Sequence, residues 1–220
     1  MNNNENAKKG LTKKQSITII SVLGALLIVL ALLNTLDFDA IFEKIFKKDS
    51  ETPEYNYFFY DPDYDTDILE DSEYLALDRT ISYSEGPITY RDADLDNFFG
   101  TSVLKDYFET LINGDAKGYA ALFTDEYKVA NVIPQKFPQQ RIYNITIERS
   151  TEPYVFEETD LDGKYTGITR YVYTVNYFIQ YNTGTVRNDI DSSSTRPLII
   201  EVYETPAGVQ KINAIVIGKS

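Results

Sequence analysis

The spacing of hydrophobic and polar residues divides the chain into regions with different periods. Residues 16–36, "SITIISVLGALLIVLALLNTL", contain no charged residue. A helix of this length rises about 30 Å, enough to cross the hydrocarbon core of a bilayer. A buried soluble helix is seldom apolar all round, and a cleaved signal peptide has a shorter apolar region that ends in an A-x-A-like site. The pattern therefore predicts an uncleaved transmembrane helix over 16–36.

The lysines around this span predict its orientation. Four lysines precede the span and three follow it, and basic residues favour the cytoplasmic side: Lys8, Lys9, Lys13 and Lys14 before it, Lys44, Lys47 and Lys48 after it. We expect residues 1–15 to be a cytoplasmic tail. The bulk of the chain is then extracytoplasmic, and residues 16–36 contact the lipid bilayer.

A short amphipathic segment follows at 37–48. The apolar residues of "DFDAIFEKIFKK" share one helical face: Phe38, Ile41, Phe42, Ile45 and Phe46. Three interpretations stay open for this juxtamembrane helix. It can lie among lipid headgroups, form a seam for self-association, or continue the membrane helix outward.

Residues 49–98 are acidic and rich in tyrosine, and they predict a spacer that is partly ordered. They contain two arginines and fifteen acidic residues, so their net charge of −13 equals that of the whole chain. Aspartates alternate from Asp61 to Asp67, but an EF-hand starting at Asp61 would need Gly and Glu where Thr66 and Ser72 stand. We therefore assign no metal site, and a looser calcium site stays open. "ILEDSEYLALDR" favours a short helix, and "ISYSEGPITY" favours a hairpin turning at Gly-Pro.

From residue 99 the periods predict a helical hairpin followed by strands. Apolar residues recur at helical spacing at Val103, Leu104, Tyr107, Phe108 and Leu111. Asn113-Gly114 ends this helix, and Asp115 caps a second helix that buries a stripe of Ala116, Tyr119, Ala120 and Phe123. "DEYKVANVI" adds a third helical turn or two. Four later segments have the period of strands: "RIYNITIER", "GITRYVYTVNYFIQY", "RPLIIEVYE" and "VQKINAIVI".

Together these elements predict an α+β domain over 99–220, with the helical hairpin packed on a curved antiparallel sheet. "VLKDYFETLINGDAKGYAALFTDEY" resembles the opening of nuclear transport factor two-like domains. That resemblance implies a cystatin-like, cone-shaped fold. It also implies an architecture similar to the membrane-anchored scaffold proteins of conjugation and type IV secretion machines. The fold hosts isomerases, cyclases, dehydratases and non-catalytic scaffolds, so it does not define a function.

The amino-acid composition limits the kinds of catalytic and metal site that the chain can form. The chain has no cysteine and no histidine, which excludes thiol nucleophiles, Cys/His zinc sites and a His-Asp dehydratase pair. An isomerase-like site would need an inward-facing aspartate, but Asp106, Asp115 and Asp125 fall at polar or capping positions. The strand tyrosines are read as core or surface aromatics: Tyr143, Tyr171, Tyr173 and Tyr177. We assign no catalytic residue and no cofactor, and the lack of a basic face argues against nucleic-acid binding.

One loop, "TGTVRNDIDSSSTRP" at 183–197, is the candidate partner-contact site. It contains four charged residues: Arg187, Asp189, Asp191 and Arg196. Crossed Arg–Asp pairs can stiffen a loop that presents a binding edge, whereas the alternative is a solvated loop with weak surface ion pairs.

We expect a non-enzymatic, single-pass membrane protein whose extracytoplasmic domain binds a protein partner or itself. The alternative is a pocket domain on the cell surface that binds a small ligand or has isomerase or dehydratase activity.

Overall fold

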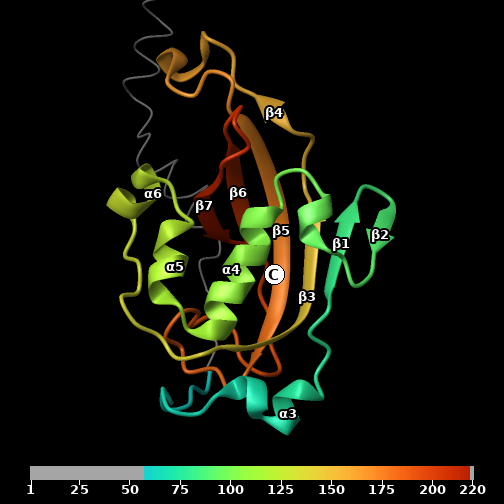
Figure 1. The fold of residues 1–220 in the computed structure, drawn as a ribbon, viewed down its shortest axis with the longest axis vertical. Helices are drawn as coiled ribbons and strands as arrows, with labels where there is room; N and C mark the ends of the chain where they lie inside the picture. Colours follow the sequence, from blue (N-terminus) through green and yellow to red (C-terminus); the bar gives the residue numbers. More distant parts are fainter. Residues whose placement is uncertain (1–56, 219–220) are drawn as a thin grey trace, which may run out of the picture. The chain divides into compact units, whose positions relative to one another are not determined.

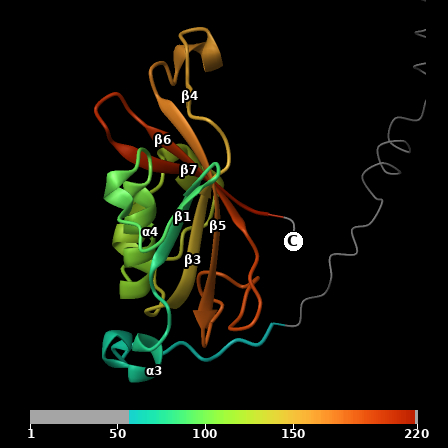
Figure 2. The same cartoon turned by 90° about the vertical axis from the view of Figure 1, so that its right-hand side faces the viewer.

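The computed structural model describes residues 57–218, which form a mixed α+β fold with a curved, open sheet of seven strands (Figure 1). The helices are α3 (Ser72–Leu75), α4 (Ser102–Asn113), α5 (Ala116–Ala121) and α6 (Asp125–Ala130). The strands are β1 (Ile81–Glu85), β2 (Ile88–Tyr90), β3 (Arg141–Arg149), β4 (Tyr154–Val155), β5 (Thr169–Gln180), β6 (Leu198–Glu204) and β7 (Gln210–Ile217). The helices α4 and α5 cover one face of the sheet (Figure 2), and the predicted α+β class is confirmed.

The predicted tail 1–15, membrane helix 16–36 and juxtamembrane helix 37–48 lie outside the described residues. Within 57–218, none of the helices has the length and apolar character that crossing a membrane requires.

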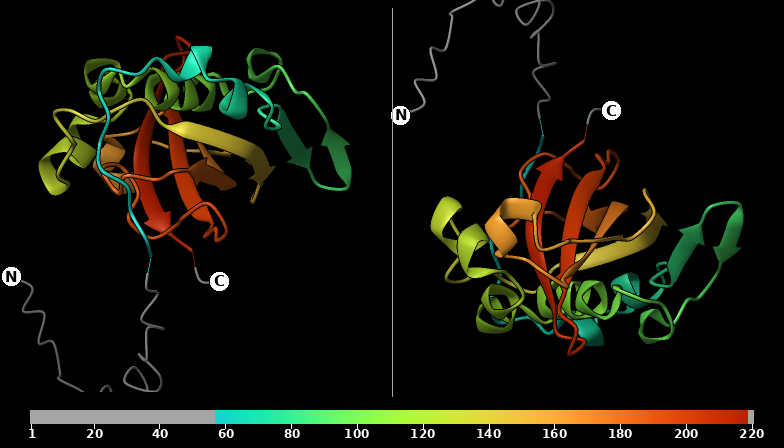
Figure 3. Two further views of the ribbon diagram at one scale, coloured as in Figure 1. Left: turned by 90° about the horizontal axis from the view of Figure 1, so that it is seen from below. Right: turned by 90° about the horizontal axis from the view of Figure 1, so that it is seen from above.

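The strand order is β2-β1-β3-β5-β6-β7, and β4 pairs with β5 beside this path. The prediction of an antiparallel sheet holds for every pair except one, because β1 and β3 run parallel, with Ile81 opposite Ile145. Helices α4 to α6 lie between these two strands in the sequence, and such a crossover returns the chain in the same direction. Figure 3 shows the β1–β2 hairpin at the edge of the sheet beyond β3.

Two irregularities accompany the curvature of the sheet. The register of β3 against β5 shifts between Tyr143 and Thr146, where Asn144 has a φ of 50°. A second shift, between Glu201 and Val202, separates two parts of the β6–β7 ladder. Such bulges bend a strand and increase its twist, so they help the sheet to curve around the helices.

The helical hairpin forms as its spacing predicts. The five periodic residues of α4 are all buried: Val103, Leu104, Tyr107, Phe108 and Leu111. Gly114 ends α4 with a φ of 67°, a left-handed conformation that glycine adopts without strain. The Asp115 carboxylate accepts a hydrogen bond from the N–H of Gly118 at 2.8 Å and caps α5. Of the predicted stripe, Tyr119 in α5 and Phe123 just after its end are buried, and Ala116 and Ala120 are half-buried. The neighbouring Leu122 is buried as well.

Large aromatic side chains fill the core between helices and sheet. Tyr171, Tyr173 and Tyr177 of β5 are buried, whereas Tyr143 is half-buried, as the sequence predicts for core and surface aromatics. Their hydroxyls need partners inside a core. The Tyr173 hydroxyl donates to the Phe99 carbonyl at 3.0 Å, and the hydroxyls of Tyr107 and Tyr177 lie 3.2 Å apart.

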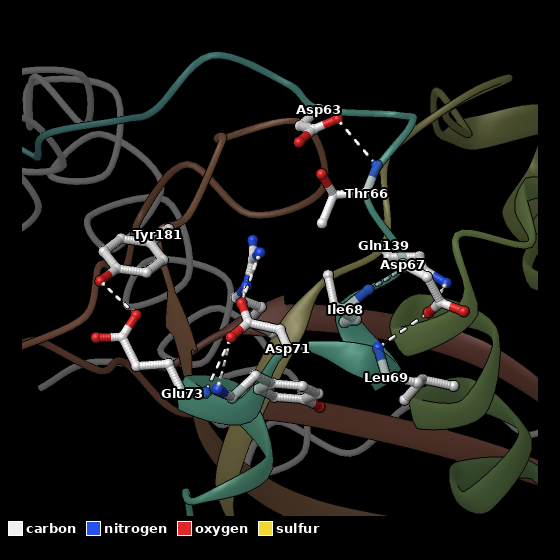
Figure 4. Close-up of polar contacts among 11 residues, drawn as sticks. Asp63, Thr66, Asp67, Ile68, Leu69, Asp71, Glu73, Gln139 and Tyr181 are labelled. Atoms are coloured by element: carbon white, nitrogen blue, oxygen red, sulfur yellow. Dashed lines mark hydrogen bonds and ion pairs between the residues drawn. The ribbon is translucent and has the colours of Figure 1, made fainter.

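Residues 57–78, here named the strap, cross one end of the sheet. The N–H of Ile68 donates to Gln139 Oε1 at 2.8 Å, and the buried Tyr74 hydroxyl donates to the Ile142 carbonyl at 3.0 Å (Figure 4 shows the Ile68–Gln139 contact). The short helix and the hairpin predicted within 49–98 are both present. The sequence predicts a spacer here, and in the structure residues 57–98 belong to the same compact unit as 99–218.

Candidate functional site

The loop between β5 and β6 closes a pocket of about 230 Å³ at one end of the helical layer. Helices α4 to α6 supply three tyrosines to this pocket, β6 and β7 supply aliphatic side chains, and the loop supplies its charged groups. Its lining consists of Tyr107, Tyr119, Tyr127, Val132, Pro134, Val186, Arg187, Asn188, Asp189, Leu198, Ile215 and Ile217. Two of the four predicted loop residues, Arg187 and Asp189, therefore line a cavity of the fold.

Arg187 and Asp189 form a two-point ion pair. Arg187 donates from Nε to one carboxylate oxygen at 2.7 Å and from Nη2 to the other at 2.5 Å. The two side chains are only 6% and 9% exposed. The alternative of a solvated loop with surface ion pairs is therefore wrong for these two residues. The two partners are close in the sequence, because Asp189 follows Arg187 by two positions.

The ion pair with Asp189 uses only some of the hydrogen-bond donors of the Arg187 guanidinium. Its Nη2 also donates to the Arg196 carbonyl at 3.1 Å, and its Cζ lies 5.4 Å from the centre of the Tyr177 ring. Nη1 is buried and has no hydrogen-bond acceptor among residues 57–218. Burial by itself lowers the pKa of Arg187, but the hydrogen bonds and charge of Asp189, together with the neighbouring Tyr177 and Tyr107, outweigh this and raise the pKa above its ordinary value. The group is a permanent buried cation.

The tyrosines of the pocket are held as neutral hydroxyls. Burial raises the pKa of Tyr107 and of Tyr119 above the ordinary value of tyrosine, because the phenolate form loses its hydration. The pocket thus combines a cation with neutral O–H groups, of which the Tyr107 hydroxyl already has a partner in the Tyr177 hydroxyl. Asp189, the carboxylate that lines it, is already engaged by Arg187. This arrangement suits binding of an acceptor better than proton abstraction.

The other two predicted residues lie elsewhere in the loop. One Asp191 carboxylate oxygen accepts from the N–H groups of Ser193 and Ser194, each at 2.8 Å, and so holds a turn. The Arg196 side chain reaches the Gly218 carbonyl at 3.5 Å. The loop therefore contains a buried ion pair between Arg187 and Asp189, whereas Asp191 holds a turn of the loop backbone.

Sequence reasoning missed Asn182, which organises the loop from within. This side chain is buried, and its amide nitrogen donates to the carbonyls of Arg187 and Ile190, both at 2.8 Å. Its amide oxygen accepts from the N–H of Gly184 at 2.9 Å. The Asn-Thr-Gly sequence signals a turn at this point, but nothing in it predicts the longer-range bonds.

The aspartates considered for an isomerase-like site lie away from this pocket. Asp115 caps α5, Asp125 pairs with Lys128 at 3.4 Å, and Asp106 is exposed on α4. Within residues 57–218, no group of three or more acidic side chains is arranged to hold a metal ion.

Apolar side chains surround the mouth of the pocket. We name Val132, Pro134, Val186 and Ile217 the rim, since all four line the pocket and none is buried. Val132 is 98% exposed and Ile217 is 45% exposed. Exposed apolar groups that gather around a concave site are typical of contact surfaces.

Comparisons with protein families, curated proteins and solved structures find no match to this chain.

Proposed function

We propose that this protein is a non-enzymatic, single-pass membrane protein whose extracytoplasmic domain is a protein-interaction module. The contact surface in this proposal is the Arg187 pocket with its rim. The observation that carries it is the pairing of a fully exposed apolar side chain, Val132, with a buried cation in one concave site.

The N-terminal part of the proposal rests on the sequence. The uncharged run 16–36 supports a membrane anchor, and the lysines before it support a cytoplasmic N-terminus. The helical hairpin on a curved sheet supports a nuclear transport factor two-like cone, the fold that the motif at 103–127 resembles. Membrane-anchored scaffolds with such a domain are the architecture that this combination favours.

The chemistry of the pocket defines what a partner would bring. An apolar side chain of the partner covers the rim, and a carbonyl or carboxylate oxygen next to it accepts from Arg187 or from a tyrosine hydroxyl. Contacts of this kind bury apolar area and satisfy donors together, which is the pattern of a binding hot spot.

The proposal is tested by isolating the full-length protein from native membranes after mild cross-linking. A Val132→Ser/Ile217→Ser variant removes apolar groups of the rim, and a Val155→Ser/Val209→Ser variant removes comparable exposed valines elsewhere, which are 54% and 52% exposed. We expect cross-linked partners to be lost from the rim variant and retained by the control. Equal recovery from both variants would contradict the proposal.

A second candidate function is favoured by the buried Arg187 cation in the lining of the pocket: the pocket binds a small carboxylate. Benzoate should then raise the unfolding temperature of the full-length protein. A variant with Arg187→Met and Asp189→Leu should show no such rise, because it removes the cation without leaving a lone buried charge. A rise of equal size in both proteins would exclude the arginine as the binding group.

A further inference from the structure

The edge strand β7 leaves part of its backbone without a partner strand. Its first half is covered, because the N–H of Ile212 donates to the Leu122 carbonyl at 2.8 Å and the N–H of Thr124 donates to the Ile212 carbonyl at 3.0 Å. After Ile212, β7 is still the last strand of the sheet, and within residues 57–218 no strand other than β6 pairs with it (Figure 1). Residues 213–217 therefore form an open edge of the described sheet.

The ladder with β6 fixes which backbone groups of this edge point outward. The N–H of Gly218 donates to the Pro197 carbonyl at 2.7 Å, so Gly218 faces β6. The direction of hydrogen bonding alternates along an antiparallel strand. Val216 therefore also faces β6, whereas Ile215 and Ile217 point their N–H and C=O groups away from it. Among the described residues, none forms a hydrogen bond with these outward groups, so they are available to another strand.

This edge lacks the features that usually prevent strand pairing. Exposed edges are commonly blocked by charged side chains, by proline or by a very short strand. At the opposite edge of the sheet, β2 is only three residues long and lies between Pro87 and Arg91. Residues 212–218, "INAIVIG", contain neither a charge nor a proline. Val216 is 59% exposed and Ile217 is 45% exposed, so apolar side chains accompany the open backbone.

The charges around this edge favour a second copy of the chain as its occupant. The loop 131–134, "NVIP", which lines the Arg187 pocket together with β7, is also uncharged. The whole chain has a net charge of −13, so most contacts between two copies bring like charges together. A contact through β7 does not, because the strand end and the loop beside it have no charge.

We propose that two copies of this protein pair through β7, antiparallel and about a two-fold axis at Val216. This register places Ile215 of one copy opposite Ile217 of the other. Because both residues have outward backbone groups, each such pair exchanges two hydrogen bonds, and the two-fold axis repeats the exchange. Val216 then lies opposite its counterpart in a non-hydrogen-bonded pair, where side chains come closest. The two sheets become continuous, and both open edges are closed together.

This pairing rests on the proposed interaction module and names a second copy as one protein that the module binds. Ile217 belongs both to the rim and to the open edge, so the two form one continuous surface. The membrane anchor of the proposed function would hold the copies in one plane and raise their effective concentration, which favours a contact through a short strand.

Disulfide trapping in native membranes tests the pairing, and the absence of cysteine from the chain makes each introduced thiol unique. Val216→Cys places two thiols opposite each other, at a separation that suits a disulfide. Val209→Cys, at an exposed position of the β6–β7 turn, is the control. Two full-length copies with different affinity tags are co-expressed and oxidised with copper phenanthroline. We expect a reducible dimer that contains both tags from Val216→Cys and none from Val209→Cys. No dimer from Val216→Cys, or as much dimer from the control, would overturn the proposal.

A proline variant separates backbone pairing from a purely apolar contact. Ile217→Pro removes an N–H that the described sheet does not use, whereas Ile217→Ala shortens the side chain and keeps that N–H. Combined with Val216→Cys, Ile217→Pro should lower the yield of disulfide about tenfold, because it removes a hydrogen bond on each side of the axis. Ile217→Ala should lower the yield less. Equal yields from the two double variants, both confirmed as folded by circular dichroism, would overturn pairing through the backbone.

The self-pairing and the proposed function fail in different ways. If the Val216→Cys dimer is absent while other proteins still cross-link to the rim, the self-pairing alone is overturned. If the dimer forms while the Val132→Ser/Ile217→Ser variant keeps its cross-linked partners, the self-pairing is supported and the rim proposal is contradicted.

Discussion

Two arginine–aspartate pairs in this molecule have similar chemistry and different surroundings. Arg187 and Asp189, in the loop between β5 and β6, are 6% and 9% exposed. Arg141 and Asp71, which join β3 to the strap, are 19% and 23% exposed. Both pairs hydrogen-bond through Nε and Nη2 of the arginine, but only the loop pair is almost fully removed from water.

The comparison shows that the cost of removing one partner of an ion pair depends on how well water can hydrate the charge that is left. Removing one partner of a buried pair leaves a lone charge in a medium that solvates it poorly, whereas a lone charge near the surface is rehydrated. We therefore expect the loop pair to control the conformation of the pocket. The strap is held mainly by its buried side chains and backbone contacts.

The largest effect is expected from Asp189→Ala. This change leaves the Arg187 guanidinium buried without its counter-charge, which should lower the free energy of unfolding by about 3–5 kcal/mol. Urea titration of the full-length protein in detergent micelles, followed by far-ultraviolet circular dichroism, measures the loss. The control is Arg187→Met with Asp189→Leu, which removes both charges and should recover most of it. A loss below about 1 kcal/mol in the single variant would show that the pair behaves as a surface pair.

A smaller loss is expected from Asn182→Ala, which tests whether the loop also depends on neutral hydrogen bonds. The change leaves the carbonyls of Arg187 and Ile190 without the donor that they share. The free energy of unfolding should fall by about 1–3 kcal/mol. The exposed Asn188 of the same loop provides the control, and Asn188→Ala should leave the urea midpoint unchanged. Equal effects of the two changes would contradict this role of Asn182.

For the strap, Tyr74→Phe should have a modest effect. The buried hydroxyl of Tyr74 donates to the Ile142 carbonyl at 3.0 Å, and its loss should cost about 1 kcal/mol. The same urea titration measures it. Tyr64→Phe changes an exposed tyrosine of the strap and serves as the control. If the control lowers stability as much as Tyr74→Phe, the buried hydrogen bond does not hold the strap.

The smallest effect is expected from Asp71→Asn, and it should depend on pH. Hydrogen bonds from the Glu73 N–H, and then from Arg141, lower the pKa of Asp71 below 3.8. A lowered folded-state pKa gives stability that is present above the unfolded-state pKa and is lost as the pH falls through the folded-state value. The urea midpoints of wild type and Asp71→Asn should therefore differ slightly at neutral pH and converge in acid. A gap that stays constant across this range would contradict the assignment.

The sequence predicts the local parts of this fold well because their signals are local. Val103 to Leu111 mark the buried face of α4 by spacing alone, and Gly114 marks its end. The parallel pairing of β1 with β3 could not be predicted in this way, because it joins Ile81 to Ile145 across the helices.

The burial of the Arg187–Asp189 pair could not be predicted from the sequence either. Charged residues in a polar loop are usually exposed, and the burial of this pair depends on Asn182 and on the ring of Tyr177 in the preceding strand. A second cavity, between the strap and the end of the sheet, is also formed by distant residues, since Asp63 comes from the acidic segment and Gln180 from the end of β5.

The central claim, that the rim of the Arg187 pocket contacts a protein partner, is tested most directly by site-specific photo-cross-linking in native membranes. A photoreactive residue replaces Val132 of the rim in one full-length variant and Val209 of the β6–β7 turn in another; both valines are exposed. The account predicts a discrete cross-linked complex from position 132 and none from position 209. The same products from both positions, or no product from position 132, would contradict it.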